Sequence, residues 1–273
     1  MYAQGRLSMS RKKGIPRERV DQIVRLLREK DLLTIDDICT HIGVSPITAR
    51  RDLADLEDLG FLRRTTGGAV PLEPLFYEPF RYDSTFQEQL DRNAAEKRRI
   101  AVAASELVRD GETIASTAGT TTTQVIRCLR HRTDLKLKLV TNGVNIAMEV
   151  SQQKHLDVFL TGGHMRGDWF SLAGGDAIQT LRQYFVDTVF VGVNGIDPEQ
   201  GLTCFNPDEA ALNAAMVEQA KRRIVVADHS KLSVVATHRI CPVGAVHILI
   251  TDSGASEEAV APYVAQGIEV RRV

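Results

Sequence analysis

The chain has 273 residues, 43% hydrophobic and 25% charged, with a formal net charge of −1. This composition is ordinary for a globular protein with a sizeable core, and it excludes a uniformly basic nucleic-acid binder. The charge is nevertheless uneven, because residues 1–70 carry 13 Lys and Arg against 10 Asp and Glu, whereas the remainder is acidic. A basic N-terminal module on an acidic body indicates local contact with DNA, although chance asymmetry would give the same count.

The four cysteines show no CxxC spacing, which argues against a zinc knuckle or a redox pair: they are Cys39, Cys128, Cys204 and Cys241. Scattered single cysteines suit a reducing cytoplasm. Residues 1–14 lack the apolar stretch of a signal peptide, and no apolar run approaches the roughly 18–20 residues that span a membrane. The histidines show no ligand spacing. We therefore expect a cytoplasmic protein with no membrane segment, no metal site and no cofactor.

The N-terminal residues predict a tail followed by two helices. Residues 1–14 are expected to be disordered. A first helix is expected from about Pro16 to Lys30, with an apolar face of Val20, Ile23, Val24 and Leu27. Thr34 predicts the start of a second helix and Gly43 its end, with Ile35, Ile38 and Ile42 facing inward.

A third helix is expected after the turn that leads into Ser45, a good N-cap that precedes Pro46, a good first helical residue. Gly60 is placed where this helix would stop, and Ala49, Leu53 and Leu56 share one apolar face. Two arginines beside a hydroxyl and a methyl-bearing side chain suit a DNA major groove, and the outward residues are Ile47, Thr48, Arg50 and Arg51.

A small basic hairpin is predicted next, with a strand over residues 61–64 and a tight turn at Gly67-Gly68. Residues 15–70 therefore predict a winged helix-turn-helix domain. The predicted DNA-binding residues are Ser45, Ile47, Thr48, Arg50, Arg51, Arg63 and Arg64.

The next segment, residues 71–92, is rich in proline and aromatic residues and predicts a linker that docks on a neighbouring surface. A long amphipathic helix is expected from about Asn93 to Arg109, opening a second domain over residues 93–273. Strands then alternate with helices. The expected strands cover residues 113–115, 137–140, 156–160, 188–191, 224–227 and 246–250, and the helices lie near 121–132, 145–153, 174–185, 207–222 and 256–266. This order predicts an α/β domain with an open, mostly parallel sheet covered on both faces.

Ligands of open α/β sheets bind beyond the carboxyl ends of the strands, and small, hydroxyl-bearing and amide residues recur there in this sequence. Glycine followed by three threonines at 119–122 leads into a helix, an arrangement that fits a phosphate. The predicted effector-binding residues are Gly119, Thr120, Thr121, Thr122, Thr141, Asn142, Gly162, Gly163, Asn194, Gly195, Glu209, Asp228 and Lys231.

Simpler roles stay open for several of these residues. The threonines also fit plain helix capping, and Lys231 fits a surface lysine. Glu209 also fits the last position of a capping box that starts at Asn206. Gly162-Gly163 also fits a turn of the chain.

Residues 48–53, the segment 56–60 and residues 64–69 resemble the DNA-binding signature of the DeoR family of bacterial transcriptional regulators. The second domain resembles the sensor domain of that family. Its marks are Gly119-Thr120-Thr121, Thr141-Asn142, Gly162-Gly163, Gly195-Ile196 with Gly201-Leu202, Glu209-Ala210 and Asp228-His229-Ser230-Lys231. The resemblance covers about residues 16–252.

The resemblance implies a repressor of sugar-catabolic genes, with a sensor domain similar to ribose-5-phosphate isomerase that binds a phosphorylated sugar. Three positions depart from the family pattern. Thr117 stands in place of a common Asp, Thr66 in place of a His, and Asn213 in place of a Lys.

The first hypothesis is therefore a non-enzymatic repressor whose partners are a double-stranded DNA operator and a phosphorylated sugar, acting as a homodimer or homotetramer. A transcriptional activator is an alternative, because the sign depends on where the operator lies. A second alternative is a sugar-phosphate isomerase with a DNA-binding appendage, whose acid/base carboxylate would come from Glu209, Asp197 or Asp228.

Overall fold

The computed structural model of the chain divides into two compact units, residues 1–76 and 77–273. It describes residues 16, 19–20, 22–23, 26–27, 30, 32–58, 62–71 and 84–273. The predicted tail, the predicted helix stop at Gly60 and most of the predicted linker lie outside these residues. Among the described residues, no helix combines the length and the apolar character that crossing a membrane requires.

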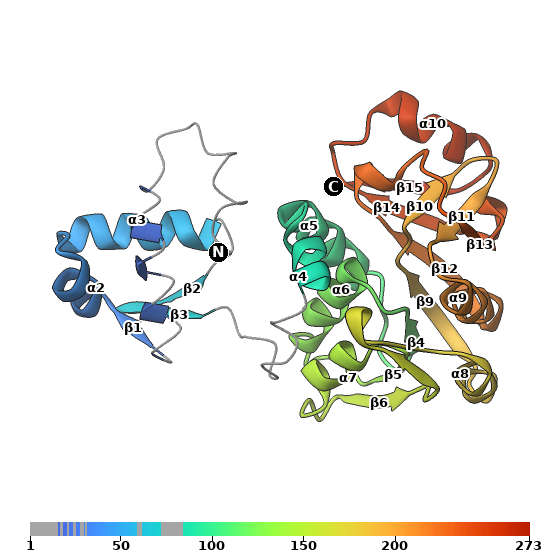
Figure 1. Ribbon diagram of the computed structural model, residues 1–273, viewed down its shortest axis with the longest axis horizontal. Coiled ribbons are helices and arrows are strands. Elements are labelled where there is room, and N and C mark those ends of the chain that lie inside the picture. The colour runs from blue at the N-terminus through green and yellow to red at the C-terminus, as the bar shows by residue number, and fades with distance from the viewer. Residues whose placement is uncertain are drawn as a thin grey trace. The chain divides into compact units, whose positions relative to one another are not determined.

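The N-terminal unit combines helices with a three-stranded antiparallel sheet of order β1-β3-β2 (Figure 1). Its elements are β1 (Leu33–Thr34), α2 (Ile35–Ile42), α3 (Pro46–Asp58), β2 (Leu62–Thr65) and β3 (Gly68–Pro71). The predicted caps of α2 are confirmed. The Thr34 hydroxyl accepts the Asp37 N–H at 3.1 Å, and Gly43 ends the helix in the left-handed conformation with φ 76°.

The helices of this unit pack through the predicted apolar faces. Ala49, Leu53 and Leu56 of α3 are buried together with Val20, Ile23 and Leu27, and these last three belong to the helical described residues between 19 and 27. An ion pair reinforces the contact, since Arg19 Nε lies 2.9 Å from a carboxylate oxygen of Asp52, which is almost fully buried. This packing fixes which side of α3 faces outward.

The predicted turn of the wing is displaced by one residue, and β2 continues to Thr65 instead of ending at residue 64. Thr66 and Gly67 make the turn, and Gly68 begins β3, paired with Thr34 of β1. A Cβ at Gly68 would lie 2.1 Å from the Leu33 carbonyl oxygen, so glycine permits the close approach of β1. Strand β1 was not predicted, because a strand of two residues has no detectable periodicity.

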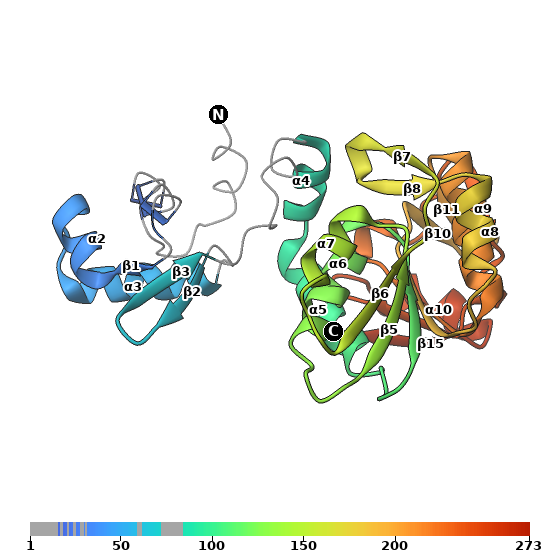
Figure 2. The ribbon, with the colours of Figure 1, turned by 90° about the horizontal axis from the view of Figure 1, so that it is seen from below.

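The C-terminal unit is built on a seven-stranded sheet of order β15-β14-β12-β9-β4-β5-β6, in which every recorded neighbouring pair is parallel (Figure 2). Its strands are β4 (Thr113–Ser116), β5 (Leu137–Thr141), β6 (Leu156–Leu160), β9 (Val186–Val191), β12 (Ala220–Val226), β14 (Ile248–Thr251) and β15 (Glu269–Arg272). The chain runs outward from β4 to β6, then returns to β9 on the other side of β4. The β4/β9 boundary is therefore the topological switch point, where open α/β sheets bind ligands.

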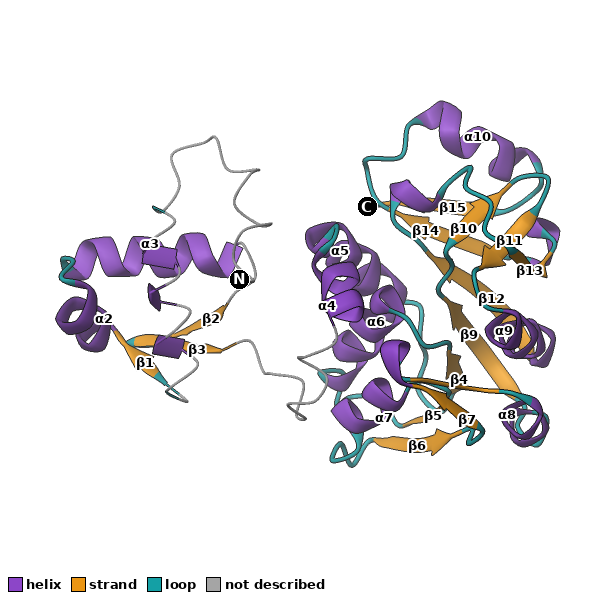
Figure 3. Cartoon of the chain, viewed as in Figure 1, coloured by secondary structure: helices purple, strands orange, loops and turns teal. Residues whose placement is uncertain are grey.

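Helices cover both faces of this sheet, as predicted (Figure 3). One face packs against α5 (Ala94–Ser105), α6 (Thr120–Arg130) and α7 (Val144–Val150), and the other against α8 (Gly175–Leu181), α9 (Pro207–Gln219) and α10 (Glu257–Ala265). Consecutive strand residues point to opposite faces. Ile114 packs in the core on the α5, α6 and α7 side, and Ala115 packs in the core on the α8, α9 and α10 side. Burial on both faces explains why these strands read as continuous apolar runs.

Several elements depart from the predicted boundaries. The helix predicted over 93–109 ends at Ser105, after which the Leu107 and Val108 N–H groups turn to carbonyls three residues back. The structure adds α4 (Ser84–Asp91) within the predicted 71–92 segment, and its buried Phe86 ring meets the Phe170 ring edge-on at 5.4 Å.

The structure also adds short antiparallel strands around the main sheet. They are β7 (His164–Arg166) with β8 (Ser171–Ala173), and β10 (Gly195–Asp197), β11 (Gly201–Cys204) and β13 (His238–Cys241). A 3₁₀ turn, η3 (Gly167–Trp169), joins β7 to β8, and two further 3₁₀ turns are η4 (His229–Lys231) and η5 (Val243–Ala245). Strands of three or four residues are too short to show a period in the sequence.

Candidate functional sites

The outward face of α3 carries the residues predicted to contact DNA. Ile47 is 78% exposed, Arg50 and Arg51 are exposed, and Thr48 is half-buried. The Ser45 hydroxyl accepts the Thr48 N–H at 3.2 Å, so Ser45 starts the helix as predicted. This surface offers two guanidinium groups beside a methyl-bearing side chain, which is chemistry suited to base edges in a major groove.

The wing presents its two arginines differently. Arg63 and Arg64 are both exposed. The Arg64 Nε lies 2.7 Å from a carboxylate oxygen of Glu57 in α3, and the Arg64 backbone N–H donates to the other oxygen at 2.8 Å. These two bonds hold the pKa of Glu57 below its ordinary value, and the backbone hydrogen bond has the larger effect. This pair fastens the wing to α3 and occupies part of the Arg64 guanidinium.

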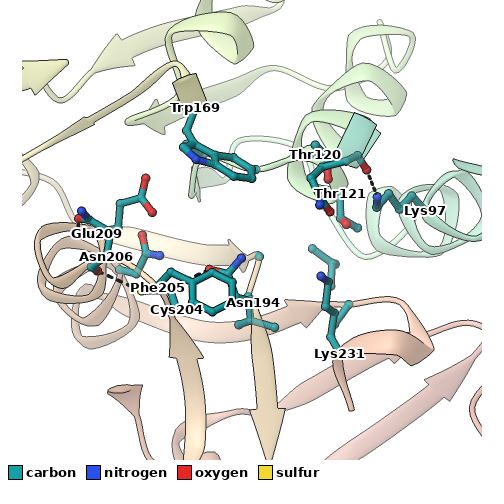
Figure 4. Close-up of a pocket in the computed structure, with 18 of the residues that line it drawn as sticks. Lys97, Thr120, Thr121, Trp169, Asn194, Cys204, Phe205, Asn206, Glu209 and Lys231 are labelled. Carbon is teal, nitrogen blue, oxygen red and sulfur yellow. Dashed lines mark hydrogen bonds between the residues drawn. The ribbon is translucent and has the colours of Figure 1, made fainter. Parts of the chain in front are cut away.

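A pocket lies beyond the carboxyl ends of the strands at the β4/β9 switch point (Figure 4). Its lining comes from the loops after β4, β9 and β12, from α4, α5, α6 and α9, and from the β7–η3 and β11–α9 segments. The lining residues are Gln89, Lys97, Ala118, Gly119, Thr120, Thr121, Arg166, Trp169, Gly192, Val193, Asn194, Cys204, Phe205, Asn206, Glu209, Asn213, Val226, Ala227 and Lys231.

The N-terminus of α6 forms one side of the pocket. Gly119 is its N-cap, and no side chain caps the first turn. The Thr122 and Thr123 hydroxyls instead donate to the Gly119 carbonyl oxygen, at 3.0 and 2.7 Å. The threonine run therefore does not cap the helix N–H groups, and the positive end of the helix dipole faces the pocket at Thr120 and Thr121.

Two lysines line the same side of the pocket. Burial lowers the pKa of Lys97 to about 8. The charge of Asp228 opposes this shift, and the nearby charge of Lys231 adds to it by a smaller amount. The Lys97 ammonium donates to the carbonyl oxygens of Gln89 and Arg92. Two ammonium groups that line the same side of a cavity can together bind an anion.

The opposite side is formed by the start of α9. The Asn206 side chain caps this helix by accepting the Glu209 N–H at 3.0 Å. The Glu209 carboxylate does not return to the cap. One of its oxygens lies 2.6 Å from Arg166 Nη1 and 2.6 Å from the Ser171 hydroxyl, which places the carboxylate in the pocket. The sequence left both roles open, and the structure shows the helix start without the capping box.

Aromatic and amide side chains complete the wall. Trp169 and Phe205 lie on opposite sides of the cavity in Figure 4, and the Phe205 side chain is widely exposed. The Asn194 side-chain oxygen accepts the Phe205 N–H at 3.2 Å, which ties the loop after β9 to the loop after β11. An apolar cavity wall with a few convergent polar groups is typical of a small-molecule site.

Six of the predicted effector residues line this pocket, and they are Gly119, Thr120, Thr121, Asn194, Glu209 and Lys231. The other seven do not, namely Thr122, Thr141, Asn142, Gly162, Gly163, Gly195 and Asp228. The Asn142 side chain shows why, since it accepts the Ala118 N–H at 2.7 Å and donates to the Leu172 carbonyl at 2.9 Å.

The remaining six residues that do not line the pocket are likewise engaged with the chain or turned away. Thr122 bonds to Gly119, and the Thr141 hydroxyl donates to the Ser116 carbonyl at 2.8 Å. Gly163 and Gly195 closely approach backbone oxygens, and Gly162 is exposed.

Asp228 is held behind the pocket. Burial favours a higher pKa for this carboxyl, but hydrogen bonds from Ser230 and Asn93 and the charge of Lys97 outweigh it and hold the pKa below its ordinary value. The carboxylate is therefore ionised, and Asn93 donates to it at 2.9 Å. It supplies a negative charge near Lys97 without lining the pocket.

Sequence reasoning missed several lining residues. Lys97 is placed on a predicted amphipathic helix and reads as a solvated charge, and Arg166 and Trp169 belong to elements too short to predict. Cys204 lines the pocket although its neighbours in sequence form no motif, and Asn213 was noted in the sequence only as a departure from the family pattern. Among the described residues, no group of three or more His, Cys, Asp and Glu side chains is arranged to hold a metal ion.

Two family models match the chain: the DeoR-like helix-turn-helix domain over residues 19–74 and the DeoR C terminal sensor domain over residues 92–253. The chain is 36% identical over 241 residues to the transcriptional repressor AccR of Agrobacterium fabrum, covering 87% of this chain and 90% of AccR. It is 32% identical over 235 residues to the HTH-type transcriptional repressor GlcR of Bacillus subtilis, covering 86% and 88%.

Among solved structures, the chain is similar to ribose 5-phosphate isomerase A from Methanocaldococcus jannaschii, with 21% identity over 51% of this chain and 54% of that one, and a TM-score of 0.37. The two domain models together cover the wing, the helix-turn-helix and six of the seven strands of the main sheet, all but β15. The chain belongs to the DeoR family of transcriptional regulators.

Proposed function

We propose that this chain is a DNA-binding transcriptional repressor of carbohydrate-catabolic genes, and that a phosphorylated sugar in the pocket modulates its affinity for the operator. Residues 15–70 would read DNA, residues 71–92 would connect, and residues 93–273 would sense the effector. The observation that carries the effector half is the convergence of Lys97, Lys231 and the uncapped N-terminus of α6 on one cavity.

A phosphate group fits that convergence for electrostatic reasons. The first N–H groups of α6 point along the positive end of the helix dipole, where anions bind. A dianion between Lys97 and Lys231 would stabilise the charged form of Lys97, which burial disfavours. The Thr120 and Thr121 hydroxyls add donors at the same end.

The DNA half of the proposal rests on the outward face of α3. Arg50 and Arg51, with Ile47 and Thr48, would set sequence choice in the major groove, while Ser45 and the wing residues Arg63 and Arg64 would add phosphate contacts. A homodimer or homotetramer would present paired helices to two half-sites. The effector would shift this binding only through different affinities for two conformations.

An isomerase is the less supported alternative. Asp197 accepts the backbone N–H groups of Glu199 and Gln200, both at 2.9 Å, and does not line the pocket. Glu209 is the one carboxylate among the described lining residues, and Arg166 and Ser171 already bond to one of its oxygens. Relatives over most of the chain are named as repressors. Isomerase turnover that disappears in Glu209→Gln would favour the enzyme.

The proposal is tested with the full-length protein and DNA from its own promoter region. A panel of phosphorylated and unphosphorylated sugars is screened by thermal shift, because a ligand of the folded state raises the melting temperature. Hits are then added to a fluorescence-anisotropy titration of the DNA. We expect phosphorylated sugars to be bound and to change the DNA affinity. Stabilisation by unphosphorylated sugars alone would overturn the phosphate assignment.

Lys231→Ala should weaken both effects, and Lys221→Ala is the matched control. Lys221 is an exposed lysine whose ammonium pairs with Asp187 at 2.9 Å, and it is absent from the pocket lining. Equal loss in both variants would indicate a general effect of charge.

A further inference from the structure

We infer that the pocket takes a ligand with a single anionic group, and that Asn213 binds an uncharged, hydroxyl-bearing end of that ligand. The inference rests on the proposed function, because it assumes that the anion lies at α6. The new part is the kind of ligand group that the α9 side of the pocket, opposite α6, selects. The observations that carry it are the side chains of α9 and the distribution of charge over the two sides.

Among the described residues that line the pocket, Asn213 alone has a buried side-chain polar atom without a hydrogen-bond partner. It is 6% exposed, and its amide oxygen has no hydrogen-bond partner among the described residues. A buried amide without a partner costs free energy that a bound ligand can recover. Asn213 lies four residues after Glu209 on α9, so both side chains project from the same face of the helix. The Asn213 amide can therefore bind a ligand group on the α9 side of the pocket, opposite α6.

The charges of the two sides differ. Lys97 and Lys231 line the α6 side, and the carboxylate near them, Asp228, does not line the pocket. On the α9 side, the Arg166 guanidinium lies 2.6 Å from the Glu209 carboxylate, so these charges offset one another. The Glu209 carboxylate faces the cavity (Figure 4), where it can accept a hydrogen bond from a ligand hydroxyl. Because the ion pair with Arg166 leaves the α9 side without net positive charge, this side attracts a second ligand anion less than the α6 side does.

These two observations define a ligand class. A sugar or alditol monophosphate places its phosphate at α6 and its hydroxyl groups against Glu209 and Asn213. A hydroxyl both donates and accepts, which matches a carboxylate oxygen and an amide. A sugar bisphosphate, or a phosphorylated sugar acid, would place a second negative charge next to Glu209 and would bind more weakly. Trp169 stands over the space between the two sides and can cover the apolar face of a sugar ring (Figure 4).

The test compares matched ligands on the full-length protein by isothermal titration calorimetry. The ligands are glucose 6-phosphate, glucitol 6-phosphate, 6-phosphogluconate, fructose 1,6-bisphosphate and inorganic phosphate. We expect glucose 6-phosphate or glucitol 6-phosphate to bind at least about tenfold more tightly than either ligand with an anionic group at both ends, 6-phosphogluconate and fructose 1,6-bisphosphate. This difference is on the scale of one unfavourable charge contact. Similar affinities for all the organic phosphates would overturn the inference while leaving the proposed function intact.

Two substitutions assign the selectivity to Asn213. Asn213→Leu should lower the affinity for the preferred monophosphate roughly five- to tenfold, the scale of one lost hydrogen bond, and should leave the affinity for inorganic phosphate unchanged. Asn213→Lys adds a cation on the α9 side. It should raise the affinity for 6-phosphogluconate relative to the affinities for glucose 6-phosphate and glucitol 6-phosphate. Circular dichroism confirms folding of each variant, and the gain expected of Asn213→Lys keeps the test decisive if Asn213→Leu does not fold.

The controls separate this inference from the proposed function. Lys231→Ala should weaken inorganic phosphate and monophosphates alike, because it alters the α6 side. If no phosphorylated ligand and no phosphate binds, the proposed function fails. If they bind, and both Asn213 variants keep the wild-type order of affinities, the role of Asn213 fails alone.

Discussion

The two units build their candidate surfaces in opposite ways. The DNA surface of the N-terminal unit comes from one helix and the adjoining hairpin, within residues 45–64. The pocket of the C-terminal unit draws its lining from many elements between Gln89 and Lys231. A surface built from neighbours in sequence depends on local helix formation, whereas a distributed pocket depends on the register of a whole sheet. The two should therefore fail separately, by different substitutions.

The largest expected effect comes from the core of the N-terminal unit. Leu53 is 1% exposed in α3, and Leu53→Ala should cost about 2–5 kcal/mol. A unit this small has little stability to spare. We expect DNA binding to be lost while the thermal shift with a phosphorylated sugar remains, measured by anisotropy and by scanning fluorimetry.

The matched control is Leu212→Ala, since Leu212 is fully buried in α9 of the other unit. It should weaken sugar-phosphate binding and lower the melting temperature of the C-terminal unit. Loss of both functions in each variant would show that the two units unfold together.

The next effect concerns the DNA surface itself. Arg50→Ala combined with Arg51→Ala should reduce affinity for promoter DNA about 100-fold, because good contacts to base edges are each worth ~1–3 kcal/mol. Both side chains are exposed, so the fold should not change. Anisotropy at fixed salt measures the loss. Arg132→Ala, which removes an arginine paired with Asp134 in the C-terminal unit, should leave DNA affinity unchanged.

A smaller effect is expected from pH at the pocket. Burial lowers the pKa of Lys97 to about 8, so the ammonium is lost as pH rises through that value. Sugar-phosphate affinity should fall roughly tenfold between pH 7 and pH 9 by calorimetry. Lys97→Met should bind weakly at both pH values, and Lys231→Met should keep the pH step. A step that persists in Lys97→Met would assign it to another group.

The sign for stability is opposite. In the unfolded chain Lys97 returns to an ordinary pKa of 10.5, so between about pH 8 and 10.5 the unfolded state binds more protons. This group therefore raises the free energy of unfolding of the C-terminal unit as pH increases through that window. Urea denaturation of the wild type and Lys97→Met, at pH 8 and pH 10, isolates the contribution.

The smallest effect compares two helix caps. Thr34 caps α2 through a reciprocal box with Asp37, and Ser256 caps α10 by accepting the Ala259 N–H at 3.1 Å. Thr34→Ala and Ser256→Ala should each cost about 1 kcal/mol. Differential scanning calorimetry should place the first loss in the N-terminal unit and the second in the C-terminal unit. The reverse assignment would contradict the division of the chain.

Much of this protein was determined by its sequence alone. The caps Thr34 and Gly43, the apolar face of α3 and the six apolar runs of the main sheet all carry local signals, because hydrophobic periodicity and capping act over a few residues. The outward arginines of α3 follow from the same periodicity. Loops rich in glycine and threonine at the carboxyl ends of the strands also pointed to the edge of the sheet where the pocket lies.

Only the tertiary structure decided which side chains meet there. Lys97 reaches the pocket because α5 packs beside α6, and Arg166 meets Glu209 because the β7–β8 hairpin lies against α9. Thr141 and Asn142 have the same chemistry as the lining residues, yet their hydrogen bonds fix neighbouring loops. Local sequence sets which residues end a strand, but strand order and helix packing set which of them face a shared cavity. The pairing of distant segments has no periodic trace in the chain.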